Sequence, residues 1–100
     1  MAATLSASQK RYLRGLAHSL KSLILLGEKG LTDAVVAELD LALEHHELVK
    51  VRVPGEDRDA REAIIEELAE RTGSAIVQRI GHVACLYRRH PKSPQIALPR

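Results

Sequence analysis

The stretch SLILLGEKGLTDAVVAELDLALEHH, residues 22–46, decides the fold of this chain because it joins three local patterns. Residues 22–26 form a short, mostly apolar run that stops at a turn signal, and such a run predicts a buried strand. From residue 31 leucine or valine recurs at every fourth position, which predicts a helix over residues 31–46 with Thr32 as its cap. The sequence therefore predicts a strand that leads through a Gly-x-x-Gly loop, residues 27–30, into a helix.

The loop Gly27-Glu28-Lys29-Gly30 has the composition of a phosphate-binding turn. Glycine allows positive φ and lets a ligand approach the backbone without a Cβ in the way. The following helix presents unpaired N–H groups and the positive end of its dipole, and Lys29 adds a cation. We expect the loop to bind phosphate, and we expect the charge of Glu28 to oppose this contact unless its side chain points away.

Two further helices are predicted from periodicity. The first is capped by Ser6 or Ser8 and ends near His18. Its residues at core spacing are Tyr12, Leu13, Leu16, Ala17 and Leu20. The third helix spans residues 57–72 and is closed by Gly73. The residues of this helix that we expect to face the core are Ala60, Ile64, Leu68 and Ala69.

Three further strands follow from alternation and turn signals. Residues 48–53 alternate strictly, with valines on one face and Lys50 and Arg52 on the other, which is typical of a half-buried strand with a basic outer face. Residues 75–80 and 83–88 predict a hairpin, because only a Gly-His pair separates them.

The element order α-β-α-β-α-β-β predicts an α/β (α+β) fold in one compact domain, residues 1–100. The helices between the first three strands require right-handed crossovers, and the closing hairpin makes the four-stranded sheet mixed. From about residue 89 to residue 100, prolines and polar residues predict an extended C-terminal tail. Its end, residues 96–98, either pairs at a sheet edge or packs back onto the domain.

Charge is segregated along the chain although the net charge is only +2. Residues 1–30 hold five basic groups and one acidic group, whereas residues 31–87 hold six basic and twelve acidic groups. The last residues, 88–100, add four basic groups, among them the cluster Arg88, Arg89 and Lys92. Basic ends around an acidic middle indicate one face for polyanions and one solvated face, while charges scattered without function are the alternative.

Cysteine usage and hydropathy favour a cytoplasmic protein. Cys85 is the only cysteine and lies in an apolar run, so we expect a buried thiol in a reducing compartment. The sequence has no apolar run near the roughly 18–20 residues that span a membrane, and its N-terminus lacks a signal-peptide core. We therefore expect no membrane association.

Patterns typical of catalysis or metal binding are missing from the sequence. His45 and His46 are adjacent and point in different directions on a helix, whereas a helical zinc pair needs a spacing of four. Ser-His-Asp, Cys-His and P-loop patterns do not occur, and Glu66-Glu67 lie on a predicted solvent-facing stripe. We expect no enzyme activity, no cofactor and no metal.

Several segments beyond the loop carry a family likeness. Residues 13–32 contain LRGLAHSLK and LLGEKGLT, residues 42–51 read ALEHHELVKV, and residues 78–88 contain QRIGH and LYR. In this combination the chain resembles the CRM-domain (YhbY-like) RNA-binding family over essentially its whole length. The resemblance implies a fold similar to the C-terminal domain of translation initiation factor 3, and the family's loop carries over onto residues 27–30.

The resemblance also implies a partner, because stand-alone bacterial members associate with precursors of the large ribosomal subunit. We expect a monomer that binds ribosomal RNA in such particles, with ribosomal proteins as possible further partners. Lys10 and Arg14 share a helical face and suit phosphate contacts, although a solvated helix face is the alternative. The full set of candidate RNA-binding residues is Gly27, Glu28, Lys29, Gly30, Lys10, Arg11, Arg14, Lys21, Lys50 and Arg52.

The aromatic content of the chain limits the ways in which it could bind RNA. The chain has no Phe or Trp and only two tyrosines, Tyr12 and Tyr87, so stacking of bases on an aromatic platform is disfavoured.

The alternative function is a protein-interaction module that docks a basic ribosomal or assembly protein through its acidic third helix. The acids concerned are Glu62, Glu66, Glu67 and Glu70.

Overall fold

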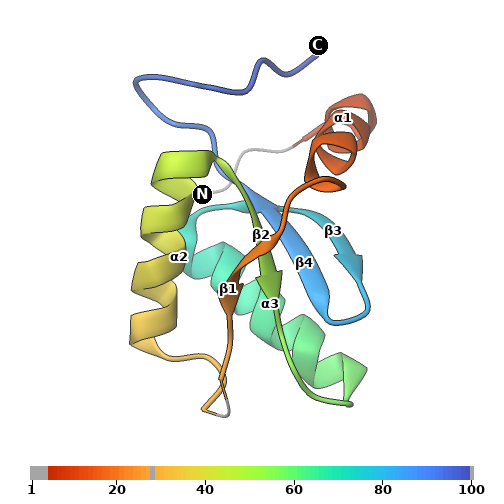
Figure 1. Ribbon diagram of the computed structural model, residues 1–100, viewed down its shortest axis with the longest axis vertical. Coiled ribbons are helices and arrows are strands. Elements are labelled where there is room, and N and C mark those ends of the chain that lie inside the picture. Colours follow the sequence, from red (N-terminus) through yellow and green to blue (C-terminus); the bar gives the residue numbers. More distant parts are fainter. Residues whose placement is uncertain (1–4, 28, 100) are drawn as a thin grey trace.

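The computed structural model describes residues 5–27 and 29–99 and contains the predicted element order (Figure 1). The elements are α1 (Ala7–Ala17), β1 (Ser22–Leu25), α2 (Asp33–His46), β2 (Leu48–Arg52), α3 (Arg58–Thr72), β3 (Ala75–Ile80) and β4 (Val83–Tyr87). The predicted α-β-α-β-α-β-β fold with a four-stranded mixed sheet is confirmed.

The sheet has the strand order β1-β2-β4-β3. β1 runs parallel to β2, to which it is joined through α2, and β4 pairs antiparallel with both β2 and β3. The register aligns Leu25 with Arg52, Arg52 with Val83, and Val83 with Ile80. Because aligned residues share a face of a sheet, these four side chains form one row across all four strands.

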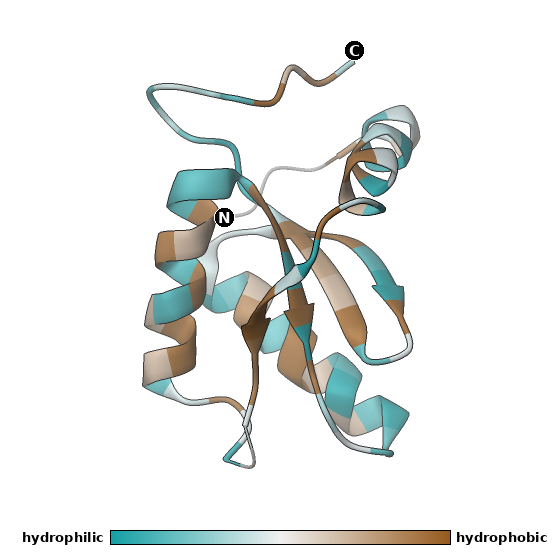
Figure 2. Cartoon of the chain, viewed as in Figure 1, coloured by the Kyte–Doolittle hydropathy of each residue, from teal (hydrophilic) through white to brown (hydrophobic). Residues whose placement is uncertain are grey.

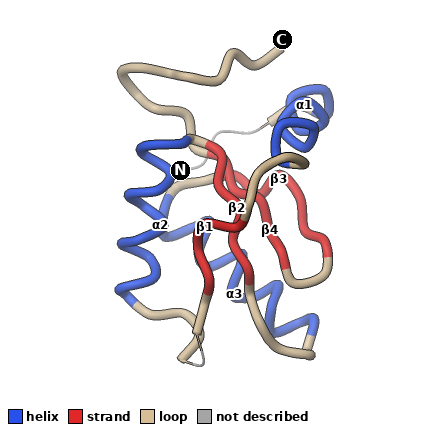
Figure 3. The backbone as a smooth tube through the Cα atoms, in the orientation of Figure 1, coloured by secondary structure: helices blue, strands red, loops and turns tan. Residues whose placement is uncertain are grey.

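One face of the sheet, here termed the closed face, is covered by α2 and α3 (Figure 3). The three valines of residues 49–53 point into this core and are fully buried, as the alternation predicts. The other buried members of this core are Ile24, Leu26, Leu39, Leu43, Ile65, Leu68, Ala69, Ala84 and Leu86.

The opposite face, here termed the open face, is covered by α1 and by the end of the chain. Its buried residues are Leu13, Ala17, Leu48, Val77, Cys85 and Tyr87, with Leu5, Ile96 and Leu98 packed against them. The tail thus packs back onto the domain, which is one of the two predicted alternatives, and Gln9 Nε2 donates to Pro99 O at 3.0 Å. Cys85 is buried as expected, and burial raises the pKa of its thiol although the charge of Lys50 opposes this shift.

The helix ends follow the predicted capping signals. Ser6 is the cap of α1 and forms a capping box with Gln9, and Thr32 Oγ1 accepts from Val35 N at 3.2 Å at the start of α2. α2 begins at Asp33 and not at residue 31, because Thr32 is extended. Gly73 closes α3 with φ +66°, a conformation that suits glycine.

The predicted core face of α3 is partly wrong. Ala60 is exposed and Ile64 is only half-buried. The buried residues of α3 are Ile65, Leu68, Ala69 and Thr72. All of them lie in the second half of the helix, because this half packs against the sheet and α2 while the first turn is in solvent.

The prediction of a buried first strand is also wrong. β1 is an edge strand, and only Ile24 of its residues is buried, whereas Leu23 is 51% and Leu25 64% exposed. On α1, Tyr12 and Leu16 are exposed although they stand at core spacing. The common reason is that α1 touches the open face through a narrow stripe and contacts β2 and β3 more than β1.

Candidate functional site

The Gly-x-x-Gly loop forms a closed turn at the end of β1 (Figure 1). Gly30 N donates to Gly27 O at 3.0 Å, and Gly30 has φ +67°, which favours glycine. Lys29 is exposed at the tip, while Glu28 lies outside the described residues. The turn therefore presents a cation and backbone at the surface, directly before the cap of α2.

Groups of the chain itself already interact with the start of α2. Thr32 already satisfies one of the first N–H groups of the helix. Asp33 lies in the first turn and accepts from Arg71 Nη2 at 2.7 Å, and this hydrogen bond raises the pKa of Arg71. A carboxylate at this position already interacts with the positive end of the helix dipole. Phosphate binding at this end would thus depend on the loop backbone and Lys29.

The cations of α1 lie at the other end of β1 from the loop (Figure 1). Arg11 and Arg14 are exposed and Lys10 is half-buried. The connecting residues 21–27 span roughly 20 Å at the usual rise of a strand. The structure therefore separates the predicted basic surface into two ends and does not bring the loop and α1 together.

Lys21, Lys50 and Arg52 lie between these two ends. Lys21 and Lys50 line one groove of about 450 Å³ between the end of α1 and strands β1 and β2. Lys50 Nζ donates to Leu20 O at 2.9 Å, which holds this cation at the groove, and Arg52 is exposed beside Leu25. Figure 2 shows that the strands of the sheet are coloured largely as hydrophobic.

The predicted cations differ from the structural arginines in their partners. Within residues 5–27 and 29–99, no carboxylate lies within 4.0 Å of the charged groups of Lys10, Arg11, Arg14, Lys21, Lys50 or Arg52. The arginines that do form ion pairs are Arg58, Arg71, Arg79 and Arg88. Among the described residues, these six cations are thus not paired with a carboxylate.

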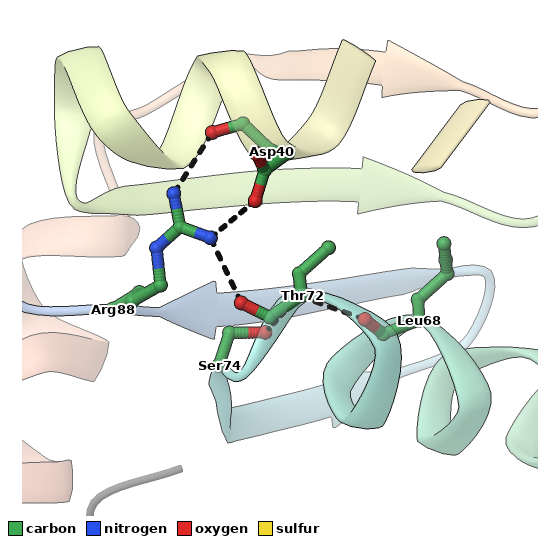
Figure 4. Close-up of polar contacts among 5 residues, drawn as sticks. All are labelled: Asp40, Leu68, Thr72, Ser74 and Arg88. Carbon is green, nitrogen blue, oxygen red and sulfur yellow. Dashed lines mark hydrogen bonds and ion pairs between the residues drawn. The ribbon is translucent and has the colours of Figure 1, made fainter. Parts of the chain in front are cut away.

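Arg88 is a structural residue and not a free member of the tail cluster (Figure 4). Its guanidinium donates to the carboxylate and to the backbone oxygen of Asp40, the latter at 3.0 Å. It also donates to Thr72 O at 2.8 Å. These bonds join the end of β4 to α2 and to the end of α3, so only Arg89 and Lys92 of the cluster remain exposed.

Glu47, which no sequence pattern singled out, is a fully buried carboxylate that organises the tail. It follows α2 with φ +61°, an uncommon value for a residue other than glycine. Its carboxylate accepts from His90 N at 2.7 Å, Gln95 N at 2.8 Å and Ile96 N at 2.7 Å. Burial favours a higher pKa for Glu47, but these hydrogen bonds and the charge of His90 hold its pKa below the usual 4.5. The only available signal was an acid between a predicted helix end and an apolar strand.

Other kinds of site find no support in the described part of the chain. Its His, Cys, Asp and Glu side chains form no group of three or more that could hold a metal ion. None of its helices combines the length and apolarity that crossing a membrane requires.

Comparisons with known proteins assign the chain to a family. The sequence model of the CRS1/YhbY (CRM) domain matches residues 5–88. A Haemophilus influenzae protein named as an RNA-binding protein is 48% identical over 97 residues, which are 97% of each chain. A Pseudomonas aeruginosa protein, whose name gives RNA binding as its expected activity, is 42% identical over 88% of this chain and 85% of its own. The solution structure of a Staphylococcus aureus protein described as a candidate RNA-binding protein has a TM-score of 0.83 and 36% identity, covering 96% of this chain and 100% of that one. The chain therefore belongs to the CRS1/YhbY (CRM) domain family.

Proposed function

We propose that this protein binds ribosomal RNA during assembly of the large ribosomal subunit, through the Gly-x-x-Gly loop and the cations along β1 and α1. As a member of its family the chain is an RNA-binding protein, and the three relatives described above are named for RNA binding and not for an enzymatic activity. Family membership supports RNA binding in general, and the ribosomal target and the contact residues are our proposal.

The observation that carries the proposal is the pair of glycines in the loop. Gly30 has a positive φ, so the fold itself requires glycine there. Gly27 has no such φ, and a Cβ built on it meets no atom within 4 Å. No contact or positive φ within the chain requires glycine at residue 27, and without a Cβ its backbone is open to close approach by a ligand.

The alternative, docking of a basic protein on α3, is weakened by the ion pairs of that helix. Glu62 pairs with Arg58 at 3.5 Å on the same helix, and Glu67 pairs with Arg71 at 3.6 Å. Glu66 pairs with Arg79 of β3 at 3.6 Å. Acids that are already compensated within the chain attract a basic partner less than isolated acids do.

The experiment is a charge reversal at both ends of β1, combining Lys10→Glu, Arg14→Glu and Lys29→Glu. We expect at least a tenfold loss of affinity for large-subunit ribosomal RNA and a flatter dependence of the affinity on salt, because phosphate contacts are lost. Fluorescence anisotropy over a salt series measures both. The matched control reverses Glu62, Glu66 and Glu67 to lysine, and it should not weaken RNA binding.

A second variant isolates the loop. Gly27→Ala should change the free energy of unfolding by no more than about 0.5 kcal/mol, since its site is exposed and uncrowded. It should still weaken RNA binding. Equal RNA affinity of the parent, the triple variant and Gly27→Ala at all salt concentrations would refute the proposed site.

A further inference from the structure

The groove beside β1 is lined by apolar side chains that take no part in the proposed phosphate contacts. Lys21 and Lys50 stand at its rim, but most of its lining is aliphatic. The apolar wall residues are Leu16, Leu20, Leu23, Leu48 and Ile96. Leu16, Leu20 and Leu23 are exposed to solvent and line the same groove, and such grouped apolar exposure is typical of an interaction site.

We propose that this groove binds an unpaired base of RNA, with the adjoining phosphate held by Lys21. The inference rests on the proposed RNA-binding function and adds a second kind of contact to it. A volume of about 450 Å³ lies within the usual range for small-molecule sites, about 300–1,000 Å³. Proteins that take up unstacked bases hold them between flat or apolar side chains, with polar groups at the edge.

The charge around the groove favours a nucleotide over a protein segment. Lys21, Lys50 and His46 contribute to the lining, and among the described residues the lining includes no carboxylate. The bond from Lys50 Nζ to Leu20 O keeps one cation at the rim before any ligand arrives. An aliphatic slot surrounded by cations complements a base that carries a phosphate, whereas an apolar peptide gains nothing from these charges.

The position of the groove connects it to the loop. β1 leads from Lys21 directly to Gly27, over roughly 20 Å at the usual rise of a strand. Arg52 and Leu25 lie along this path on the open face. A single strand of RNA bound by the loop can therefore reach the groove without leaving the surface of β1 and β2.

The buried carboxylate of Glu47 completes the groove from the other side. Glu47 Oε1 accepts from Ile96 N at 2.7 Å, and Ile96 forms one wall. The hydrogen bonds that fold the tail back thus also build the base site, which gives this buried acid a role in binding as well as in folding.

The test compares an RNA octanucleotide of mixed sequence with the duplex that it forms with its complement. The variant Leu20→Gln/Leu23→Gln should lose about five- to tenfold affinity for the single strand and keep its affinity for the duplex. Its salt dependence should match that of the parent, because no phosphate contact is removed. Lys21→Gln should instead reduce the slope of log affinity against log salt by about 0.7 for the single strand.

The matched control is Leu41→Gln, since Leu41 is 58% exposed on α2, away from the groove. Methyl NMR of the parent protein tests the groove without any substitution, so a folding defect of a variant cannot affect the result. On addition of the single strand, the methyl groups of Leu20, Leu23 and Ile96 should shift and show NOE contacts to base protons, whereas those of Leu41 should not.

Four outcomes overturn the inference, and they are distinguishable. Suppose that the parent binds RNA, that the leucine variant binds the single strand with the same affinity, and that the methyl signals of Leu20, Leu23 and Ile96 do not shift. The groove proposal alone then fails. If the parent binds large-subunit ribosomal RNA but not the single strand, the groove proposal alone fails. If it binds neither of these RNAs at low salt, the proposed function fails and the groove fails with it. If the methyl groups respond to a basic ribosomal protein or to protein concentration and not to RNA, the groove is a protein contact.

Discussion

Both faces of the sheet carry apolar side chains, but those on the open face are less completely buried and share the face with Lys50 and Arg52. On the closed face the valines of residues 49–53 have no exposed surface. On the open face the row Leu25–Arg52–Val83–Ile80 crosses all four strands, and both leucine and isoleucine are about two-thirds exposed, at 64% and 65%. The closed side of the sheet is therefore a continuous core, whereas the open side is buried only beneath α1 and the tail and is accessible elsewhere.

The difference follows from the number of helices on each face. Two helices of 14 and 15 residues cover the closed face. α1 has only 11 residues and contacts β2 and β3, so it crosses the strands of the open face. A helix is about 10 Å wide, whereas a strand of five residues is about 17 Å long, so one crossing helix leaves part of the strands uncovered. We therefore expect stability to be concentrated on the closed face, and the proposed RNA contacts of β1 and β2 lie on the open face.

The largest expected effect tests whether stability belongs to the closed face. Leu43→Ala removes a fully buried side chain between α2 and the sheet and should cost about 2–5 kcal/mol of unfolding free energy. Leu41→Ala, two positions away on the exposed side of α2, should cost less than about 1 kcal/mol. Urea denaturation followed by circular dichroism measures both, and similar costs for the two variants would contradict the comparison.

The next effect concerns Glu47, which holds the tail on the open face. Glu47→Gln replaces a carboxylate that accepts three backbone N–H groups and should cost about 1.5–3 kcal/mol. Hydrogen exchange of the His90, Gln95 and Ile96 amides should accelerate in the variant more than exchange in β2. Equal acceleration of hydrogen exchange at all amides would show that the tail does not open separately from the rest of the domain, which contradicts this prediction.

The same residue predicts how stability depends on pH. Because the pKa of Glu47 is lowered in the folded protein, its contribution is complete above its usual pKa of 4.5. The contribution is lost as the pH falls below that value through the lower folded pKa. The difference in unfolding free energy between the parent and Glu47→Gln should therefore shrink as the pH falls below about 4.5.

The smallest effect compares two buried hydroxyl groups. Thr72 Oγ1 donates to Leu68 O at 2.7 Å and lies 2.8 Å from Ser74 Oγ (Figure 4), so Thr72→Val should cost about 1 kcal/mol. The Tyr87 hydroxyl on the open face is buried with no hydrogen-bond partner among the described residues. Tyr87→Phe should therefore be neutral or stabilise the protein by up to about 1 kcal/mol. Thermal unfolding of the two variants checks the sign, and a large loss in Tyr87→Phe would reveal a partner for this hydroxyl.

Local signals predicted the elements and their ends. The caps at Thr32 and Gly73 act through hydrogen bonds and a positive φ within a few residues, so the sequence around them is sufficient. The alternation of residues 48–53 predicted which side of β2 is fully buried, because the valines must share one core. The candidate loop was predictable because its signal is also local: both of its glycines lie in one turn.

Burial of β1 and α1 was not predictable from the same kind of signal. An apolar strand has the same composition whether it is central or at the edge, so Leu23 and Leu25 gave no sign of their exposure. The misplaced core face of α3 has a related cause, because only the packing of the helix decides which of its turns meets the sheet. Glu47 was missed because its partners are contributed by residues 90–96, more than forty positions away.

The sequence by itself thus determined the order of elements, their caps and the Gly-x-x-Gly turn, since these depend on neighbours along the chain. Only the tertiary structure decided that the loop and α1 lie at opposite ends of β1, and that leucines and cations share a groove between them. The physical reason is that burial and the meeting of distant charges depend on strand order and on where a short helix rests on the sheet.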